Sequence, residues 1–263
     1  MVSQWQNQSS RLYGNSVAPL LISPQGYNKS TFCRRLLPDA LKWGYTDSLA
    51  LSDRRQVMLA MSQQLLINLD EFNQISPRVQ QGFLKNIIQL PSVKVKRPFG
   101  TNIEELPRKA SFIATSNMTD ILADPSGNRR FIGIELTAPI DTSRVPDHRQ
   151  LFAQALQLLR NGRRSWFDKA ETEQIMLWNR RYEIQEPADQ YFSLCFSVAN
   201  DPLDPAAEWL STAEIFDVIK QKVGSSLKAN TLIAFGRKLA NMPGMHRRKC
   251  ETCTRYLVKR VGQ

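Results

Sequence analysis

Residues 20–31 read Leu20-Leu21-Ile22-Ser23-Pro24-Gln25-Gly26-Tyr27-Asn28-Lys29-Ser30-Thr31. The apolar start of this stretch predicts a strand, and its polar centre predicts a turn. The apolar residues that follow, up to Pro38, have helical spacing. Strand, loop and helix in this order are typical of a phosphate-binding loop, because the backbone N–H groups of the loop and the positive end of the helix face the same anion.

The triplet Lys29-Ser30-Thr31 carries the chemistry that such a loop needs. Lys29 is predicted to contact the β- and γ-phosphates of ATP, and the Ser30 hydroxyl is predicted to bind Mg²⁺. The alternative is an ordinary strand, turn and helix with an exposed lysine.

Two positions depart from the phosphate-loop pattern G-x-x-x-x-G-K-[ST]. Ser23 stands at the first glycine and Asn28 at the second. Asparagine tolerates a left-handed backbone better than most residues, so Asn28 is expected to hold the turn. Gly26 is expected to supply part of the missing flexibility.

Two carboxylates follow a second predicted strand. Residues 65–69 are almost continuously apolar and end in Asp70-Glu71, which is typical of a buried parallel strand. Ligands of open α/β sheets bind at this carboxyl end. Asp70 is predicted to hold Mg²⁺ through a water, and Glu71 to polarise the attacking water. The alternative is a pair of solvated acids.

Polar residues also flank two later predicted strands. Residues 111–116 end at Asn117, which is expected at the same sheet edge as Asp70, within reach of the γ-phosphate or the attacking water. Arg129 and Arg130 precede the strand 131–136. Beside a phosphate site they suggest an arginine finger from a neighbouring subunit; elsewhere they are surface charge.

Four segments occur in order with compatible gaps: Lys29-Ser30-Thr31, Leu69-Asp70-Glu71-Phe72, Phe112-Ile113-Ala114-Thr115-Ser116-Asn117 and Gly127-Asn128-Arg129-Arg130-Phe131. With them, residues 15–165 resemble the virulence-associated E (VirE) family of P-loop ATPases. That family is similar to superfamily 3 helicases and the AAA+ class, and occurs with primase modules on phages and mobile elements.

The resemblance implies an α/β fold, a P-loop NTPase with a parallel sheet. It implies Lys29 and Ser30 as Walker A, Asp70 and Glu71 as Walker B, and Asn117 as sensor 1. It further implies Arg129 or Arg130 as the trans-acting finger, in a homo-oligomer that forms a hexameric ring. The hairpin predicted over residues 92–110 would then face the pore of the ring and grip single-stranded DNA.

That hairpin has its own sequence signal. Residues 93–97 alternate apolar and basic side chains, which predicts an exposed strand with a basic tip. Lys94, Lys96 and Arg97 are candidate phosphate contacts. A solvated hairpin is the alternative.

The proline-containing loop 200–205 predicts a domain boundary. We therefore expect an N-terminal helix or linker over 1–16, an ATPase domain over 17–200 and a small α+β domain over 201–263. The last of these has the order of a winged helix: helix, helix, basic hairpin. Residues 228–260 hold nine Lys/Arg and one acid, so Arg247, Arg248 and Lys249 are predicted DNA contacts. A winged helix can also be a protein-interaction module.

The composition favours an anionic partner. The 263-residue chain has a net charge of +11 and a pI of about 9.7, which favours nucleic acid over a membrane in the absence of a long apolar span. Four cysteines in a chain of this size and no signal-peptide pattern indicate a reducing cytoplasm. The predicted sheet begins so close to residue 1 that we expect the chain to be part of a longer protein.

Together these features predict a cytoplasmic, DNA-associated, helicase-like ATPase of a phage or mobile-element replication system. Its cofactors are ATP and Mg²⁺, and a primase module is an expected partner. The alternative is a DNA-binding replication or mobilisation factor with a degenerate, non-hydrolysing nucleotide site. A small-molecule P-loop kinase is a third, weaker hypothesis.

Overall fold

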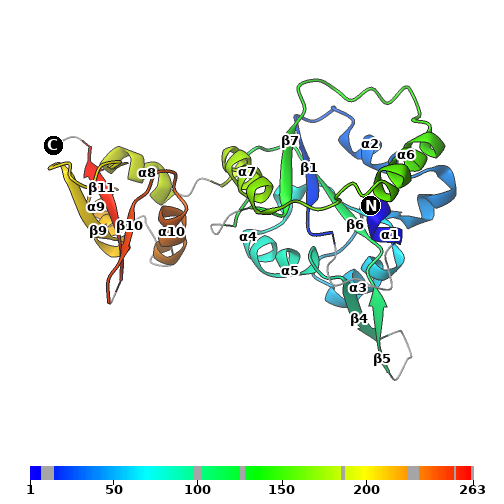
Figure 1. Ribbon diagram of the computed structural model, residues 1–263, viewed down its shortest axis with the longest axis horizontal. Helices are drawn as coiled ribbons and strands as arrows, with labels where there is room; N and C mark the ends of the chain where they lie inside the picture. Colours follow the sequence, from blue (N-terminus) through cyan, green and yellow to red (C-terminus); the bar gives the residue numbers. More distant parts are fainter. Residues whose placement is uncertain are drawn as a thin grey trace. The chain divides into compact units, whose positions relative to one another are not determined.

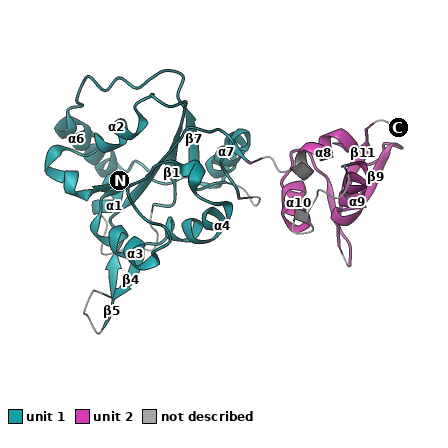
Figure 2. Cartoon of the chain, turned by 180° about the vertical axis from the view of Figure 1, so that it is seen from behind, with its two compact units in different colours: residues 1–123, 128–183 teal, residues 124–127, 184–263 magenta. Residues whose placement is uncertain are grey.

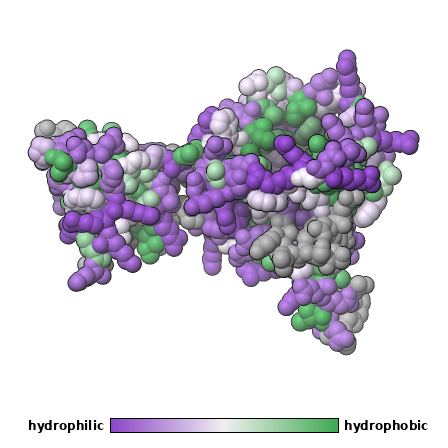
Figure 3. Space-filling view, viewed as in Figure 1, coloured by the Kyte–Doolittle hydropathy of each residue, from purple (hydrophilic) through white to green (hydrophobic). Residues whose placement is uncertain are grey.

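The computed structural model describes residues 1–6, 15–96, 102–124, 128–184, 187–223, 231–251 and 253–261. The chain divides into two compact units (Figure 2). Unit 1 comprises residues 1–123 and 128–183, and unit 2 comprises residues 124–127 and 184–263. Hydrophilic residues cover most of each unit on the face seen in Figure 3.

Unit 1 is built on a five-stranded sheet (Figure 1). The strand order is β2-β3-β6-β1-β7, and every neighbouring pair is parallel. This confirms the predicted α/β class with a parallel sheet. The strands are β1 Ala18–Ile22, β2 Tyr45–Thr46, β3 Leu66–Leu69, β6 Ser111–Ser116 and β7 Phe131–Glu135.

The central strands β3, β6 and β1 are almost entirely buried, and alternate residues of each strand point to opposite faces of the sheet. Leu20, Ile67 and Phe112 belong to one apolar cluster, and their neighbours Leu21 and Leu66 belong to another. Helices cover both clusters, as expected for parallel strands that are apolar throughout. The helices of unit 1 are α1 Val2–Gln6, α2 Lys29–Arg34, α3 Arg54–Gln63, α4 Pro77–Val79, α5 Lys85–Ile87, α6 His148–Arg160 and α7 Lys169–Asn179.

Three further segments of unit 1 have short or irregular structure. β2 is only two residues long, and the next residue, Asp47, accepts hydrogen bonds from Arg34 and Tyr45. The helical segment that contains α4 and α5 is continuous, and residues 80–84 form a π-helical turn between them. In the N-terminal segment expected to be helix or linker, Val2–Gln6 is helical and residues 7–14 lie outside the described residues.

The expected hairpin is present as β4 Ser92–Lys96 and β5 Ile103–Pro107, paired antiparallel. It projects from the body of unit 1 beside α3 (Figure 1). Its predicted tip, with Arg97, lies outside the described residues.

Unit 2 contains a small antiparallel sheet in which β11 Thr254–Arg260 pairs with β8 Phe196–Val198, β9 Ala207–Ser211 and β10 Arg247–Lys249. Its helices are α8 Pro187–Cys195, α9 Thr212–Val223 and α10 Thr231–Ala240. The predicted order of helix, helix and hairpin is observed in α9, α10 and β10–β11. Ser211 and Glu214 cap α9 reciprocally, as a capping box requires.

The division between the units falls after residue 183, whereas the sequence placed a boundary at 201. The reason is that Phe192 and Phe196, which precede the proline-containing loop, pack with Ile215 and Phe235 in one apolar cluster. A Pro-rich loop inside a domain therefore resembled a linker. Among the described residues, no helix combines the length and the apolar character needed to cross a bilayer.

Candidate functional site

The loop between β1 and α2 is held in a tight conformation by two left-handed residues. Gly26 has φ +87°, and Asn28, immediately before α2, has φ 61° and ψ 22°. The left-handed backbone expected at Asn28 is therefore observed. Asn28 Nδ2 donates to Ile140 O at 3.0 Å, and Ile140 N donates to Tyr27 O at 3.2 Å. Through these two hydrogen bonds, the segment after β7 stabilises the loop between β1 and α2.

Lys29 is the first residue of α2 and is only 7% exposed. Its Nζ donates to Ser23 O (2.8 Å), Ser23 Oγ (2.8 Å), Pro24 O (3.0 Å) and Asn117 Oδ1 (2.9 Å). Burial lowers the pKa of Lys29 below its ordinary value, and the Asp70 carboxylate opposes this shift. All four acceptors are neutral, so the ammonium has no anionic hydrogen-bond partner within the described part of the chain.

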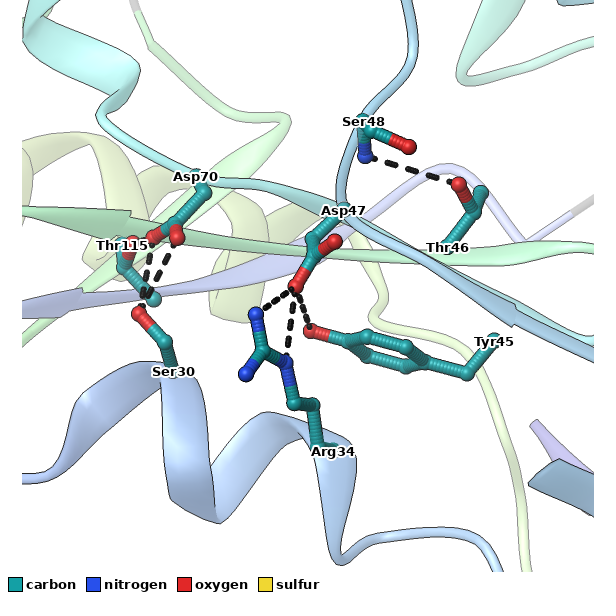
Figure 4. Close-up of polar contacts among 8 residues, drawn as sticks. All are labelled: Ser30, Arg34, Tyr45, Thr46, Asp47, Ser48, Asp70 and Thr115. Atoms are coloured by element: carbon teal, nitrogen blue, oxygen red, sulfur yellow. Dashed lines mark hydrogen bonds and ion pairs between the residues drawn. The ribbon is translucent and has the colours of Figure 1, made fainter.

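Ser30 meets Asp70 across the sheet edge (Figure 4). Ser30 Oγ lies 3.1 Å from both carboxylate oxygens of Asp70, and Thr115 Oγ1 also donates to Asp70 Oδ1. The strand order explains the meeting, because β6, with Thr115, lies between β1 and β3. The structure thus brings Asp70 into contact with Ser30, which is 40 positions away in the sequence, and with Thr115, which is 45 positions away.

Thr115 is a member of this cluster that the sequence analysis did not single out. It is buried, at 2% exposure, near the end of a strand whose other residues are mainly apolar. A hydroxyl at such a position needs a hydrogen-bond partner. The need of a buried Thr115 hydroxyl for such a partner is the feature of the sequence that could have linked this residue to Asp70.

Glu71 and Asn117 lie at the same carboxyl edge of the sheet. Asn117 contacts Lys29 directly. Glu71 is exposed, has a left-handed backbone with φ 50° and accepts a hydrogen bond from Gln74. Sterically strained conformations of this kind cluster at functional sites. Thr31, the last residue of the triplet, continues α2.

A second charged cluster beside the first was also missed by the sequence analysis (Figure 4). Asp47 accepts from Arg34 at 2.8 Å and 3.0 Å, and from Tyr45 Oη at 3.3 Å. The thiol of Cys33, on α2, is fully buried, and burial, with smaller contributions from Asp70 and Asp47, raises its pKa to about 12. Cys33 is therefore a neutral packing residue.

Arg129 and Arg130 lie at the opposite edge of the sheet. Arg130 O accepts from Ala18 N at 2.8 Å, and Ala18 pairs with Phe131 in the parallel register of β1 and β7. Both arginines therefore mark the amino ends of these strands, whereas Lys29 and Asp70 follow carboxyl ends. Within one chain the structure does not bring them to Lys29.

The predicted DNA contacts on the hairpin are less basic than the sequence suggested. Lys94 and Lys96 are exposed on β4. However, Lys94 pairs in register with Glu105, whereas Lys96 pairs with Ile103. One of the two lysines on β4 is thus matched by a glutamate on β5, and Arg97 lies outside the described residues.

In unit 2, Arg247, Arg248 and Lys249 are all exposed on β10. The Arg248 guanidinium lies 5.2 Å from the centre of the Trp209 ring, which orients it. In contrast, the basic residues of β11 are paired with acids, in the pairs Arg255–Glu214, Lys259–Asp204 and Arg260–Glu208.

Solved structures with some similarity are described as "The apo structure of NrS-1 C terminal region (305-718)" and "The A form apo structure of NrS-1 C terminal region-CTR". Each is 13% identical over 94% of this chain and 67% of the other, with TM-scores of 0.47 and 0.44. A similarity at this level carries no functional inference. A comparison with curated proteins finds no significant match.

Two family models match consecutive parts of the chain. Residues 185–258 match a domain of unknown function from B. Theta, DUF3874. Residues 15–184 match the virulence-associated protein E-like domain, and this stretch is more than half of the chain. The protein therefore belongs to the virulence-associated protein E-like (VapE-like) domain family.

Proposed function

We propose that unit 1 is a P-loop ATPase domain that binds Mg²⁺–ATP between the β1–α2 loop and the carboxyl ends of β3 and β6. The observation that carries the proposal is the contact of Ser30 Oγ with both carboxylate oxygens of Asp70. Hydroxyl and carboxylate oxygens are the ligands that Mg²⁺ prefers, and a serine after the loop lysine is a recurrent magnesium ligand in P-loop enzymes.

The surroundings of Lys29 suit a polyphosphate. A buried ammonium that is hydrogen-bonded only to neutral oxygens gains strongly from an anion. The N–H groups of a left-handed loop before a helix provide further donors for phosphate oxygens. Mg²⁺ would neutralise charge that develops on the phosphate oxygens.

The remaining predicted roles follow from position. Glu71 orients and polarises the attacking water, and Asn117 contacts the γ-phosphate or that water. Arg129 or Arg130 acts from a neighbouring copy, because both arginines lie at the far edge of their own sheet. A homo-oligomeric ring, hexameric by analogy with superfamily 3 helicases and AAA+ proteins, satisfies this requirement.

The chain's partner in this proposal is DNA, in the replication of a phage or mobile element. Membership of the VapE-like family, the net charge of +11 and the exposed cations of β10 support this assignment. Hydrolysis would drive movement along a single strand, as in a helicase.

The test is ATP hydrolysis measured with and without single-stranded DNA over a range of protein concentrations. The proposal expects DNA-stimulated turnover that rises more steeply than linearly with protein, because the arginine comes from a second copy. Lys29→Ala should abolish turnover, and hydrolysis at the wild-type rate in this variant would refute the site.

A second candidate is a DNA-binding replication or mobilisation factor that does not hydrolyse nucleotide. Ser23 and Asn28 in place of the usual glycines favour it, and Ser23 supplies two of the four acceptors of Lys29 Nζ. This candidate predicts DNA binding without turnover under any condition. Ser23→Gly should then leave DNA affinity unchanged.

A further inference from the structure

A pocket of about 780 Å³ lies in unit 1 on the side of the sheet edge away from Lys29. It is lined by residues that precede β1, by Arg129 and Arg130 before β7, and by residues 165–167 between α6 and α7. The volume is in the range of small-molecule sites. Lys29, Ser30 and Asp70 of the same chain do not contribute to its lining.

The lining carries positive charge without acidic residues. Arg130 Nη2 donates to Gln89 Oε1 at 2.9 Å, which holds this arginine against the wall. Arg129 is exposed, and no ion pair to it is found in the part of the chain that the structure describes. Asp168 and Glu171 follow the lining residues along the chain, but both are engaged with Arg164 and with the start of α7.

Two aromatic side chains share the pocket with the arginines. Trp166 is 64% exposed and Phe167 is 45% exposed. Arg164 lies 4.8 Å from the centre of the Trp166 ring. Trp166 and Phe167 are adjacent in the sequence and both line the pocket, so they offer accessible aromatic surface on which a planar ligand can stack.

Exposed aromatic rings beside an exposed guanidinium group match the two parts of a nucleotide. A base stacks on an aromatic ring, and its phosphate pairs with arginine. We infer that this pocket binds a nucleotide unit, with the phosphate on Arg129 and the base on Trp166. The unit can belong to a single DNA strand or to a free mononucleotide, because the recognised chemistry is the same. Within one chain this site is distinct from the proposed ATP site.

The experiment measures fluorescence anisotropy of a labelled decathymidylate with the full chain carrying Lys29→Ala, so that the proposed ATP site does not contribute. In this background, Trp166→Ala and Arg129→Ala should each weaken binding about fivefold or more. Trp166→Phe, which keeps an aromatic face, should retain most of the affinity. Trp43→Ala and Arg78→Ala are matched controls, since Trp43 is 63% exposed and Arg78 is exposed on α4.

Competition with thymidine 5′-monophosphate separates the two sources. Displacement at similar concentrations of the two ligands indicates a free mononucleotide, and displacement by oligonucleotide alone indicates a strand. The inference is overturned if both Trp166→Ala and Arg129→Ala bind the decathymidylate with unchanged affinity. It is also overturned if Trp166→Phe loses as much affinity as Trp166→Ala. Failure of ATP hydrolysis in the wild type would refute the proposed function and leave this result unaffected.

Discussion

Asn28 shows how a single residue adapts the loop. An L-residue in the left-handed region ordinarily costs about 1–2 kcal/mol, and asparagine reduces this cost through local hydrogen bonds. Here Asn28 also donates to Ile140 O at 3.0 Å. The sequence correctly predicted the left-handed conformation because asparagine adopts it more readily than most residues. The hydrogen bond to Ile140 joins residues 112 positions apart, so no pattern in the neighbouring sequence predicts it.

Asn28→Ala should lower the free energy of unfolding by about 1 kcal/mol, because alanine accepts φ 61° poorly. Asn28→Gly should cost less, since glycine adopts this conformation without strain. Urea denaturation compares the two variants. An Ala variant at least as stable as the Gly variant would contradict a left-handed Asn28.

Lys29 should give the protein a measurable pH dependence of stability. Burial holds its folded-state pKa below 10.5, so between that lowered pKa and 10.5 the unfolded chain binds more protons. The contribution of Lys29 to the free energy of unfolding therefore rises with pH in this interval, as the buried ammonium loses its proton.

Lys29→Met removes this group, so urea denaturation of the wild type and the variant between pH 7 and pH 10 isolates it. We expect the stability of the wild type relative to Lys29→Met to improve as pH rises. A difference that is constant with pH would contradict a lowered pKa.

At the scale of elements, the close approach of β7 to the turn after α7 depends on Gly133. A Cβ there would lie 2.2 Å from Tyr182 Cε2, whereas a Cβ at Gly82 would meet nothing within 4 Å. Gly133 N also donates to the buried Asn179 Oδ1, and Trp178 Nε1 donates to Gly133 O.

Gly133→Ala should destabilise the protein by about 1–3 kcal/mol through overpacking. Gly82→Ala, in the helical segment after α4, should be neutral or stabilise by up to about 1 kcal/mol. Thermal melting of both variants tests this contrast. Equal melting temperatures would show that Tyr182 moves aside without cost.

The elements of unit 1 were the part of the fold most open to prediction. β1, β3 and β6 are short, mainly apolar runs that end in polar groups. Because these strands are buried on both faces of the sheet, they are recognisable in the sequence. β9, in contrast, has only half-buried residues, and β8 has three residues with one fully buried. Such strands depend on their partner β11, so their own sequence carries little signal.

The net charge of the whole molecule could be predicted from the sequence, but which basic residues are paired with acids could not. Of the nine basic residues counted between 228 and 260, Arg255, Lys259 and Arg260 pair with acids before residue 215. Glu105 likewise faces Lys94 of β4 across the hairpin. Sequence windows count neighbours along the chain, whereas these partners come from other parts of the fold: helix α9, strand β5, strand β9 and the loop before β9. The same limit hid Thr115 and Asp47 from the candidate site.

The exposed cations of β10 should therefore dominate DNA binding by unit 2. Replacing Arg247, Arg248 and Lys249 together by Ala should weaken binding and reduce the slope of log affinity against log salt by about one for each DNA phosphate that the variant no longer neutralises. A matched triple variant at Arg255, Lys259 and Arg260 should change the slope less, because these residues are ion-paired. Equal slopes in the two variants would contradict this division.

The most direct test of the central claim is calorimetric titration of the protein with a slowly hydrolysed ATP analogue, with and without Mg²⁺. The account predicts binding that Mg²⁺ strengthens in the wild type, loss of binding in Lys29→Ala, and loss of the Mg²⁺ effect in Asp70→Asn. Asp39→Asn serves as a control, since Asp39 lies outside the site on the surface. Unchanged, metal-independent binding in both site variants would show that the Lys29, Ser30 and Asp70 cluster is not the nucleotide site.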